Sequence, residues 1–355
     1  MIEGVGPIMR KKLLARFGSV ASILSAPLSE LRQLQGIGPK TAQAIANARS
    51  EIDVSAELAA CSKAGFKLIG ERDERYPKLL SEIPDPPGLL FVHGDLRQED
   101  SLAIAIVGTR HATQYGLRQA ERLATGLARA GITIVSGLAR GIDTAAHQAA
   151  LAANGRTVAV LGSGLLDLYP PENAELAAQI ATQGAVISES PCYTPPLSGL
   201  FPQRNRVITG LSLGVIVVEA PLRSGALVSA QHAMEQGREV FAVPGRVDNR
   251  TSRGCHRLIR DGAKLVESVE DVLEELGPLA NATPSRDGRL LRNPAELQLN
   301  VQEQAVLTVI QDSPTSIDEV VQRSGLPVNR VLATISVLEM RKLVRRISGN
   351  FVARA

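Results

Sequence analysis

The string Phe201-Pro202-Gln203-Arg204-Asn205-Arg206 places two arginines and an amide side chain next to an aromatic ring. A guanidinium group is a planar cation that can donate paired hydrogen bonds to a phosphate, and an aromatic ring offers a face on which a nucleic-acid base stacks. The chain has no Trp and 3% aromatic residues, so Phe201 is the best candidate for a stacking platform. The alternative is structural, because the arginines could instead form salt bridges at the start of a helix.

Glycine-rich turns follow three apolar runs of the chain. They begin at Gly108, Ser136 and Gly162, and the first two also contain Arg110 and Arg140. In an open parallel sheet, ligands bind where strands end, because glycines let backbone approach a ligand and helix N-termini offer N–H donors to anions. The spacing matches neither the dinucleotide fingerprint nor the Walker pattern, so it predicts a phosphate site of another kind. The alternative is that these glycines serve only as tight turns.

Asp143 and His147 lie four residues apart, and Ser136 precedes them. These residue types could form a hydrolase triad, but Ser136 is not in a G-x-S-x-G string, and an Asp–His pair at this spacing more often orients a helix cap or a loop. The other histidines are scattered and form no zinc-binding pattern. We therefore expect no enzymatic activity, no metal site and no cofactor.

The elements that must position these residues alternate between short apolar runs and helical stretches. Strands are expected near 103–107, 132–136, 157–161, 185–188, 214–218 and 239–243, and helices over segments such as 116–130 and 170–183. Strands that are apolar on both faces are typical of a sheet covered by helices on both sides. The pattern predicts an α/β fold with a Rossmann-like, doubly wound, mainly parallel sheet.

The N-terminal region repeats one short string, since Gly4-Val5-Gly6-Pro7 is followed by Gly36-Ile37-Gly38-Pro39. The second copy resembles a helix–hairpin–helix motif, in which backbone N–H groups of Gly36 and Gly38, with Lys40 nearby, could hold a DNA phosphate. The alternative is a helix–helix turn that only packs.

The C-terminal region begins after a polar, proline-containing segment at 278–296, which we interpret as a linker. Helices expected at 300–311, 316–323 and 327–341, with a hairpin over 343–353, suggest a winged helix that binds either DNA or protein. The expected domains are therefore a helical helix–hairpin–helix (SAM-like) domain over 1–70, a Rossmann-like domain over 71–277, the linker at 278–296 and a winged-helix domain over 297–355.

Composition and charge limit the classes of protein. The 355 residues are 44% hydrophobic and 21% charged, with a net charge of +3, which is ordinary for a chain with buried cores. Positive charge is concentrated in 1–70 and 201–264, a weak indication of an anionic partner. We expect no membrane span, no secretory signal and a cytoplasmic location. The three cysteines, Cys61, Cys192 and Cys255, are too few and too widely spaced to predict a disulfide framework.

Taken together, these strings resemble the DNA-processing protein A (DprA, or Smf) family. The strings that carry the resemblance are Tyr76-Pro77, Asp85-Pro86-Pro87, Ile106-Val107-Gly108-Thr109-Arg110, Ser136-Gly137-Leu138-Ala139-Arg140-Gly141-Ile142-Asp143, Phe201-Pro202 with Arg204-Asn205-Arg206, Ser224-Gly225-Ala226-Leu227 and Val243-Pro244-Gly245. They occur in family order over about 200 residues, and the two flanking regions also resemble family domains.

The resemblance implies a non-enzymatic homodimer that binds single-stranded DNA without sequence preference and loads RecA recombinase onto it in natural transformation and DNA recombination. Carried over to this chain, it implies a phosphate pocket in which Phe201 stacks a base and Lys264 adds charge at the edge. The residues expected to contact the strand are Gly108, Arg110, Ser136, Gly137, Arg140, Gly141, Asp143, His147, Gly162, Phe201, Arg204, Asn205, Arg206, Ser224, Gly225 and Lys264.

Two positions depart from the family pattern. Ser229 stands where a threonine is common, and His256 stands in the Gly254–Ile259 string where an asparagine is usual. Neither change removes a charge, but the second puts the contacts of that loop in doubt.

Two other classes of protein remain as alternatives. The LOG phosphoribohydrolases share a glycine-rich Rossmann-like domain, but their Pro-Gly-Gly-x-Gly-Thr string has no closer counterpart here than Pro244-Gly245-Arg246. A transcriptional regulator would use the winged helix to read duplex DNA and the sheet domain as a sensor.

Overall fold

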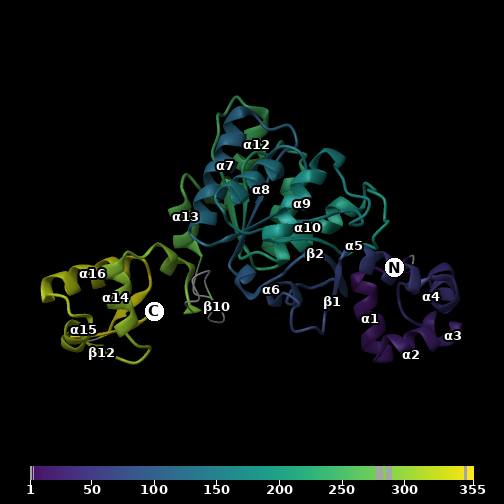
Figure 1. The fold of residues 1–355 in the computed structure, drawn as a ribbon, viewed down its shortest axis with the longest axis horizontal. Helices are drawn as coiled ribbons and strands as arrows, with labels where there is room; N and C mark the ends of the chain where they lie inside the picture. Colours follow the sequence, from purple (N-terminus) through teal and green to yellow (C-terminus); the bar gives the residue numbers. More distant parts are fainter. Residues whose placement is uncertain (1, 3, 277–282, 285–289, 348–349) are drawn as a thin grey trace. The chain divides into compact units, whose positions relative to one another are not determined.

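The computed structural model describes the whole chain except residues 1, 3, 277–282, 285–289 and 348–349 (Figure 1). Two compact units are present, Met1–Leu265 and Val266–Ala355. Within the described residues, no helix is long and apolar enough to cross a membrane.

The first unit begins with five helices: α1 (Pro7–Phe17), α2 (Val20–Ser25), α3 (Leu28–Leu31), α4 (Pro39–Glu51) and α5 (Val54–Ala64). The repeated glycine–proline strings adopt the same local structure, because Gly6 and Gly38 are extended caps, with φ/ψ of −81°/177° and −80°/170°, and each is followed by proline at the first helical position. Proline is well suited to that position because its missing N–H would have no helical partner there. The helical N-terminal domain expected from the sequence is confirmed.

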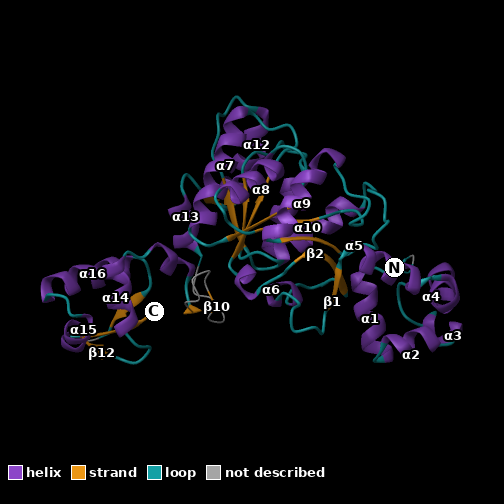
Figure 2. Cartoon of the chain, in the orientation of Figure 1, coloured by secondary structure: helices purple, strands orange, loops and turns teal. Residues whose placement is uncertain are grey.

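A nine-stranded sheet forms the centre of the first unit (Figure 2). Its strands are β1 (Lys67–Gly70), β2 (Leu89–Gly94), β3 (Ala103–Val107), β4 (Thr133–Ser136), β5 (Thr157–Val160), β6 (Ala185–Ser188), β7 (Gly214–Val217), β8 (Glu239–Ala242) and β9 (Lys264–Leu265). The order is β1-β2-β6-β5-β4-β3-β7-β8-β9, and all neighbours from β6 to β9 are parallel. All six predicted strands are confirmed, whereas β1, β2 and β9 were not predicted.

Helices cover both faces of this sheet. They are α6 (Lys78–Ser81), α7 (Gln114–Arg129), α8 (Ile142–Ala152), α9 (Ala174–Gln183), α10 (Leu200–Gly210), α11 (Gly225–Glu235) and α12 (Arg253–Arg260), with 3-10 turns η1 (Gln98–Ser101), η2 (Pro171–Asn173) and η3 (Arg250–Ser252). Alternate residues of one strand serve opposite layers: Val158 and Val160 pack with α10 and α11, whereas Ala159 packs with α9. This two-sided burial explains why the central strands are apolar at consecutive positions.

The second unit contains the three helices and small sheet of a winged helix. Its elements are α13 (Val269–Glu275), β10 (Thr283–Pro284), β11 (Leu290–Leu291), η4 (Pro294–Gln298), α14 (Val301–Val309), β12 (Thr315–Ser316), α15 (Ile317–Ser324), α16 (Val328–Met340), β13 (Val344–Arg346) and β14 (Phe351–Arg354). Strands β12, β14 and β13 form an antiparallel sheet. The expected winged helix is confirmed, although two residues of its expected Ser-Gly-Asn turn lie outside the described residues.

The segment expected to be a linker contributes to this second unit. β10 pairs with β11, and Ala295 is 2% exposed in the core that also contains Val306 and Ile335. Apolar side chains at only two or three positions of 290–296 are enough to anchor it, which is too few to produce a periodic pattern. Helix α13, expected at the end of the Rossmann-like domain, also groups with the second unit.

Candidate nucleic-acid interface

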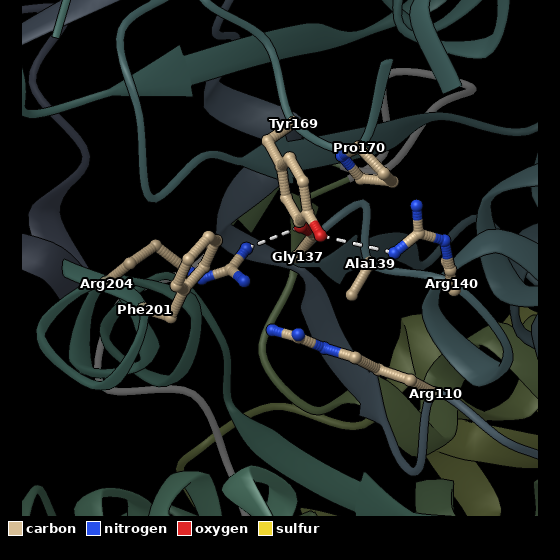
Figure 3. Close-up of a pocket in the computed structure, with 8 residues that line it drawn as sticks. All are labelled: Arg110, Gly137, Ala139, Arg140, Tyr169, Pro170, Phe201 and Arg204. Carbon is tan, nitrogen blue, oxygen red and sulfur yellow. Dashed lines mark hydrogen bonds between the residues drawn. The ribbon is translucent and has the colours of Figure 1, made fainter. Parts of the chain in front are cut away.

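A pocket lies where β3, β4 and β5 end (Figure 3). It is lined by Arg110, Gly137, Ala139, Arg140, Tyr169, Pro170, Phe201 and Arg204. Strands β5, β4 and β3 are neighbours and parallel, so their carboxyl ends meet at one edge of the sheet. The sheet therefore brings together loops that are up to about 90 residues apart in the chain.

Arg204 lies at the inner side of this pocket, with only 5% of its surface exposed. Its Nη1 donates to the carbonyl oxygens of Gly137, at 2.6 Å, and Val160, while its buried Nε has no hydrogen-bond partner. Burial lowers the pKa of Arg204 to about 10, an effect that the nearby Asp143 carboxylate opposes and Arg110 reinforces. The guanidinium is still charged at neutral pH, and its hydrogen bonds go to neutral carbonyls, so the pocket favours an anion.

Two glycines admit the side chains that form the pocket. A Cβ at Gly137 would lie 2.2 Å from Nη1 of Arg204, and a Cβ at Gly162 would lie 2.8 Å from Cδ1 of Phe201. Gly141 has φ of +77°, and a Cβ there would lie 2.5 Å from the Thr109 carbonyl oxygen. The close contacts at these three positions are with the protein itself, and Gly137 also lines the pocket.

Two neighbouring aromatic rings lie between two arginines along the pocket. The Arg110 guanidinium carbon is 5.3 Å from the Phe201 ring centroid, the Phe201 and Tyr169 centroids are 5.8 Å apart, and the Arg140 guanidinium carbon is 5.6 Å from the Tyr169 centroid. Arg140 also donates to the Tyr169 hydroxyl at 3.2 Å and pairs with Glu172 (Figure 3 shows the Tyr169 bond). Among the described residues, no carboxylate pairs with Arg110, so its charge is available to a ligand.

The loop after β4 is held by Asp143 from the first turn of α8. Its Oδ2 accepts hydrogen bonds from the backbone N–H groups of Gly137, at 3.1 Å, and Ala139, at 3.4 Å. Burial raises the pKa of Asp143, and Arg204 and the two N–H groups oppose the rise. Asp143 thus shapes the pocket from beneath and does not line it.

Ser136, Asp143 and His147 do not form a catalytic triad. The Ser136 hydroxyl donates to the Ile106 carbonyl at 2.6 Å, and Nδ1 of His147 is 2.7 Å from the Thr157 hydroxyl. Because that hydroxyl donates to the Ile134 carbonyl, Nδ1 must be the donor to Thr157. Burial lowers the pKa of His147 to about 3, so the ring is neutral and takes a structural role inside α8.

The structure places Arg206 and Asn205 away from the pocket. Arg206 is 5% exposed and pairs with Asp85 at 3.1 Å and Glu189 at 2.5 Å, while Asn205 donates to the Gly225 carbonyl at 3.2 Å. Successive helical residues are about 100° apart, so Arg204 and Arg206 point to nearly opposite sides of α10. Arg206 therefore forms the salt bridges of the structural alternative, whereas Arg204 lines the pocket.

Several other expected contacts also lie outside the pocket. Gly108 packs against Ile142 beneath it, and Ser224 caps α11 by accepting a hydrogen bond from the Ala226 N–H, next to Gly225. Lys264 lies beside Phe241 on edge strand β9, three strand positions from β3, the nearest strand of the pocket, which corresponds to roughly 14 Å. The expected placement of Lys264 at the pocket edge therefore differs from the structure, because the sheet extends two strands beyond β7.

The candidate helix–hairpin–helix residues form a separate exposed turn. Gly36 has φ of +98°, Gly38 caps α4, and Lys40 is exposed in the first turn of that helix. Gly36 and Gly38 are exposed as well, so the turn lies at the surface of the described structure.

Sequence reasoning missed Tyr169 and its neighbour Pro170 as pocket residues. Tyr169 is the second aromatic ring of the pocket, and it comes from the long segment between Gly164 and α9. The only signal was its position after the glycine turn that follows β5. A second missed feature lies elsewhere: Cys61 and Cys192 are buried with their Sγ atoms 3.4 Å apart, and Glu57 lies within 4.8 Å of both.

The comparisons with known proteins agree with this fold. Family models match "DNA recombination-mediator protein A" over residues 67–277, "DprA winged helix domain" over 292–350 and "SAM-like Helix-hairpin-helix tandem" over 1–51. Protein Smf of Synechocystis sp. is 34% identical over 98% of this chain and 95% of its own length.

Two solved structures are also similar. DNA processing protein A from Streptococcus pneumoniae has a TM-score of 0.68 and 40% identity, covering 78% of this chain and 95% of that one. DNA processing protein A from Helicobacter pylori, whose structure is described by its single-stranded DNA binding mode, has a TM-score of 0.53 and 32% identity, covering 58% and 93%. The fold defines a Rossmann-like protein with helical and winged-helix flanking domains, and its pocket is lined by Arg110, Arg140 and Arg204. The chain belongs to the DNA recombination-mediator protein A (DprA/Smf) family.

Proposed function

We propose that the pocket binds single-stranded DNA without sequence preference. The observation that carries this proposal is the row Arg110–Phe201–Tyr169–Arg140, in which two neighbouring aromatic rings lie between two arginines, with the buried Arg204 cation behind it. Every base has a face that can stack on an aromatic ring, and every nucleotide has a phosphate that arginine can bind, so such a surface does not discriminate among sequences. The DNA-binding mode attributed to the Helicobacter pylori relative supports the same reading.

The function proposed for the whole chain follows from its family. As a mediator of recombination, the protein would act as a homodimer in the cytoplasm and load RecA recombinase onto the bound strand during natural transformation and DNA recombination. Gly36, Gly38 and Lys40 would add a second backbone contact. The role is non-enzymatic, and it is supported by the structural positions of Ser136 and His147, which keep both side chains out of the pocket.

Fluorescence-anisotropy titrations with labelled oligothymidine and with duplex of equal length test the binding site. Wild type is compared with Arg110→Ala, which removes an exposed pocket cation, and with Arg122→Ala, which removes an exposed arginine on α7. We expect preference for the single strand and a loss of about tenfold in affinity only for Arg110→Ala, since a charged hydrogen bond contributes about 1.5 kcal/mol. Equal affinities of wild type and Arg110→Ala would overturn the pocket assignment.

RecA loading is tested by following recombinase ATPase activity on oligothymidine covered with single-strand binding protein. Wild type should shorten the lag before ATPase activity begins, and Arg110→Ala should not. If the wild-type protein leaves the lag unchanged, the proposed mediator role is overturned. If the protein releases free base from nucleoside monophosphates, the proposal that its role is non-enzymatic is overturned.

A further inference from the structure

Exposed arginines follow the carboxyl ends of neighbouring strands well beyond the pocket. Strands β4, β3, β7 and β8 are adjacent in that order. The loop or helix that follows each of them carries at least one exposed arginine: Arg140 after β4, Arg110 after β3, Arg223 after β7, and Arg246, Arg250 and Arg253 after β8. The loops that carry these arginines thus follow one another along one edge of the sheet.

Hydrogen bonds between these loops fix the row in place. The Thr109 N–H donates to the Glu219 carbonyl at 2.7 Å, and the Ala220 N–H donates to the Thr251 carbonyl at 2.7 Å. The Tyr115 hydroxyl, on α7, donates to the Pro244 carbonyl at 2.6 Å. The loops after β3, β7 and β8 are therefore joined to one another. The backbone positions that carry their arginines are held at defined distances from one another.

His256 contributes to the same arrangement. Its Nε2 is 3.0 Å from the Gly245 carbonyl oxygen, which ties α12 to the loop after β8. The residue that departs from the family pattern thus makes a defined contact in this chain, beside Arg250 and Arg253.

Three arginines that follow β7 and β8 retain uncompensated charge, as Arg110 does after β3. Within the described part of the chain, no carboxylate pairs with Arg223, Arg250 or Arg253, whereas Arg246 pairs with Asp248 at 2.9 Å. The other acidic group in these loops, Glu219, is 1% exposed and already accepts hydrogen bonds from the backbone N–H and hydroxyl of Thr113. The loops after β7 and β8 consequently present net positive charge to solvent.

We propose that Arg223, Arg250 and Arg253 form an edge track that binds the phosphates of a DNA strand whose base is held in the pocket. This inference rests on the proposed single-strand binding and extends its footprint across β7 and β8. From β4 to β8 there are three strand spacings, or roughly 14 Å, so one continuous strand can reach both regions. The track contains no aromatic residue, so it contacts backbone and leaves the bases free.

The test compares binding of a thymidine trinucleotide and a twelve-nucleotide oligothymidine across a salt series. The trinucleotide has two internal phosphates, which the pocket arginines can neutralise, whereas the longer strand also reaches the track. The track variant is Arg223→Gln/Arg250→Gln/Arg253→Gln. The matched control, Arg118→Gln/Arg122→Gln/Arg129→Gln, removes the same charge from exposed positions of α7.

We expect the track variant to bind the trinucleotide like wild type and the twelve-nucleotide strand about tenfold more weakly. The slope of log affinity against log salt should decrease by about 2 for the longer strand, at about 0.7 for each lost phosphate contact. The control should change neither quantity by a comparable amount. A triple arginine-to-lysine variant at the track positions should keep most of the slope, because lysine preserves the charge.

The outcomes separate the track from the pocket. If Arg110→Ala weakens binding of both strands while the track variant binds both like wild type, the edge-track proposal is wrong. The proposal that the pocket binds single-stranded DNA is then still supported. If wild type binds neither strand, both proposals are overturned. Equal losses in the track and control variants would show that only overall charge matters, and would also overturn the track.

Discussion

Helix α10 carries two arginines with equal burial and opposite surroundings. Arg204 and Arg206 are each 5% exposed, but Arg204 donates to backbone carbonyls beside the pocket, whereas Arg206 pairs with the carboxylates of Asp85 and Glu189. Burial raises the pKa of Glu189, and Arg206 opposes that rise. The comparison shows that the number of arginines in a sequence motif does not give the number of arginines that line the pocket. Two carboxylates already balance the charge of Arg206, whereas Arg204 donates its hydrogen bonds to neutral carbonyls.

The largest expected effect is on stability, from Arg206→Met. This change leaves two largely buried carboxylates without their cation, and breaking such a pair costs about 3 kcal/mol. Urea unfolding should show this loss, while the folded variant binds oligothymidine within about twofold of wild type. A large loss of DNA affinity at unchanged stability would place Arg206 in the binding site and remove the contrast with Arg204.

The matched variant Arg204→Met should show the reverse. It removes a buried cation that has no salt bridge among the described residues, but it leaves two carbonyls without a donor and the buried Asp143 carboxylate without its nearby positive charge. Stability should therefore fall by about 2 kcal/mol, less than for Arg206→Met. Affinity for oligothymidine should fall about 30-fold, because losing one charged hydrogen bond to the strand costs about 2 kcal/mol of binding free energy. If affinity stays within twofold of wild type, the buried charge does not serve the ligand.

Phe201→Ala separates stacking from charge within the pocket. Base stacking on an aromatic ring contributes about 1–3 kcal/mol, so affinity should fall about tenfold. The salt dependence should keep its slope, because no phosphate contact is removed. A slope that decreases along with the affinity would mean that Phe201 acts by holding Arg110, which lies over its ring.

His147 offers a smaller, pH-dependent test of the layer beneath the pocket. Its pKa of about 3 in the folded protein lies below the ordinary value of 6.5, so the unfolded chain binds a proton that the folded one excludes. The contribution of neutral His147 to the free energy of unfolding is therefore complete above pH 6.5. It decreases as the pH falls below 6.5, by up to about 1.4 kcal/mol for each pH unit. The free energy of unfolding of His147→Gln should therefore decrease less between pH 6.5 and pH 5.5 than that of the wild type. Parallel curves for the two proteins would show that His147 is accessible to protons in the folded state.

The parts of the fold that were predicted are those with strong local patterns. Strands such as β3 and β7 are apolar at every position because both faces are covered, and such runs are visible in sequence. β9 is only two exposed residues long, and β1 has a single buried position, so neither produces a pattern. Ala295 was assigned to a linker because its burial depends on helices that lie further along the chain.

The loops of the candidate site were predicted, and so were some but not all of its side chains. Arg110, Gly137, Arg140, Phe201 and Arg204 were expected together and do line one pocket. Tyr169 was missed because no spacing rule links it to Phe201, and Lys264 was misplaced because the number of strands between two loops depends on sheet order.

The amino-acid sequence by itself determined the alternation of strands and helices, the flanking domains and the edge of the sheet at which glycines and arginines would gather. Those properties follow from hydrophobic periodicity and from the rule that parallel strands end on the same side. The tertiary structure decided which arginine faces the pocket, which one is neutralised, and which loops are neighbours. These are properties of side-chain direction and of strand order, and both depend on contacts between residues far apart in the chain.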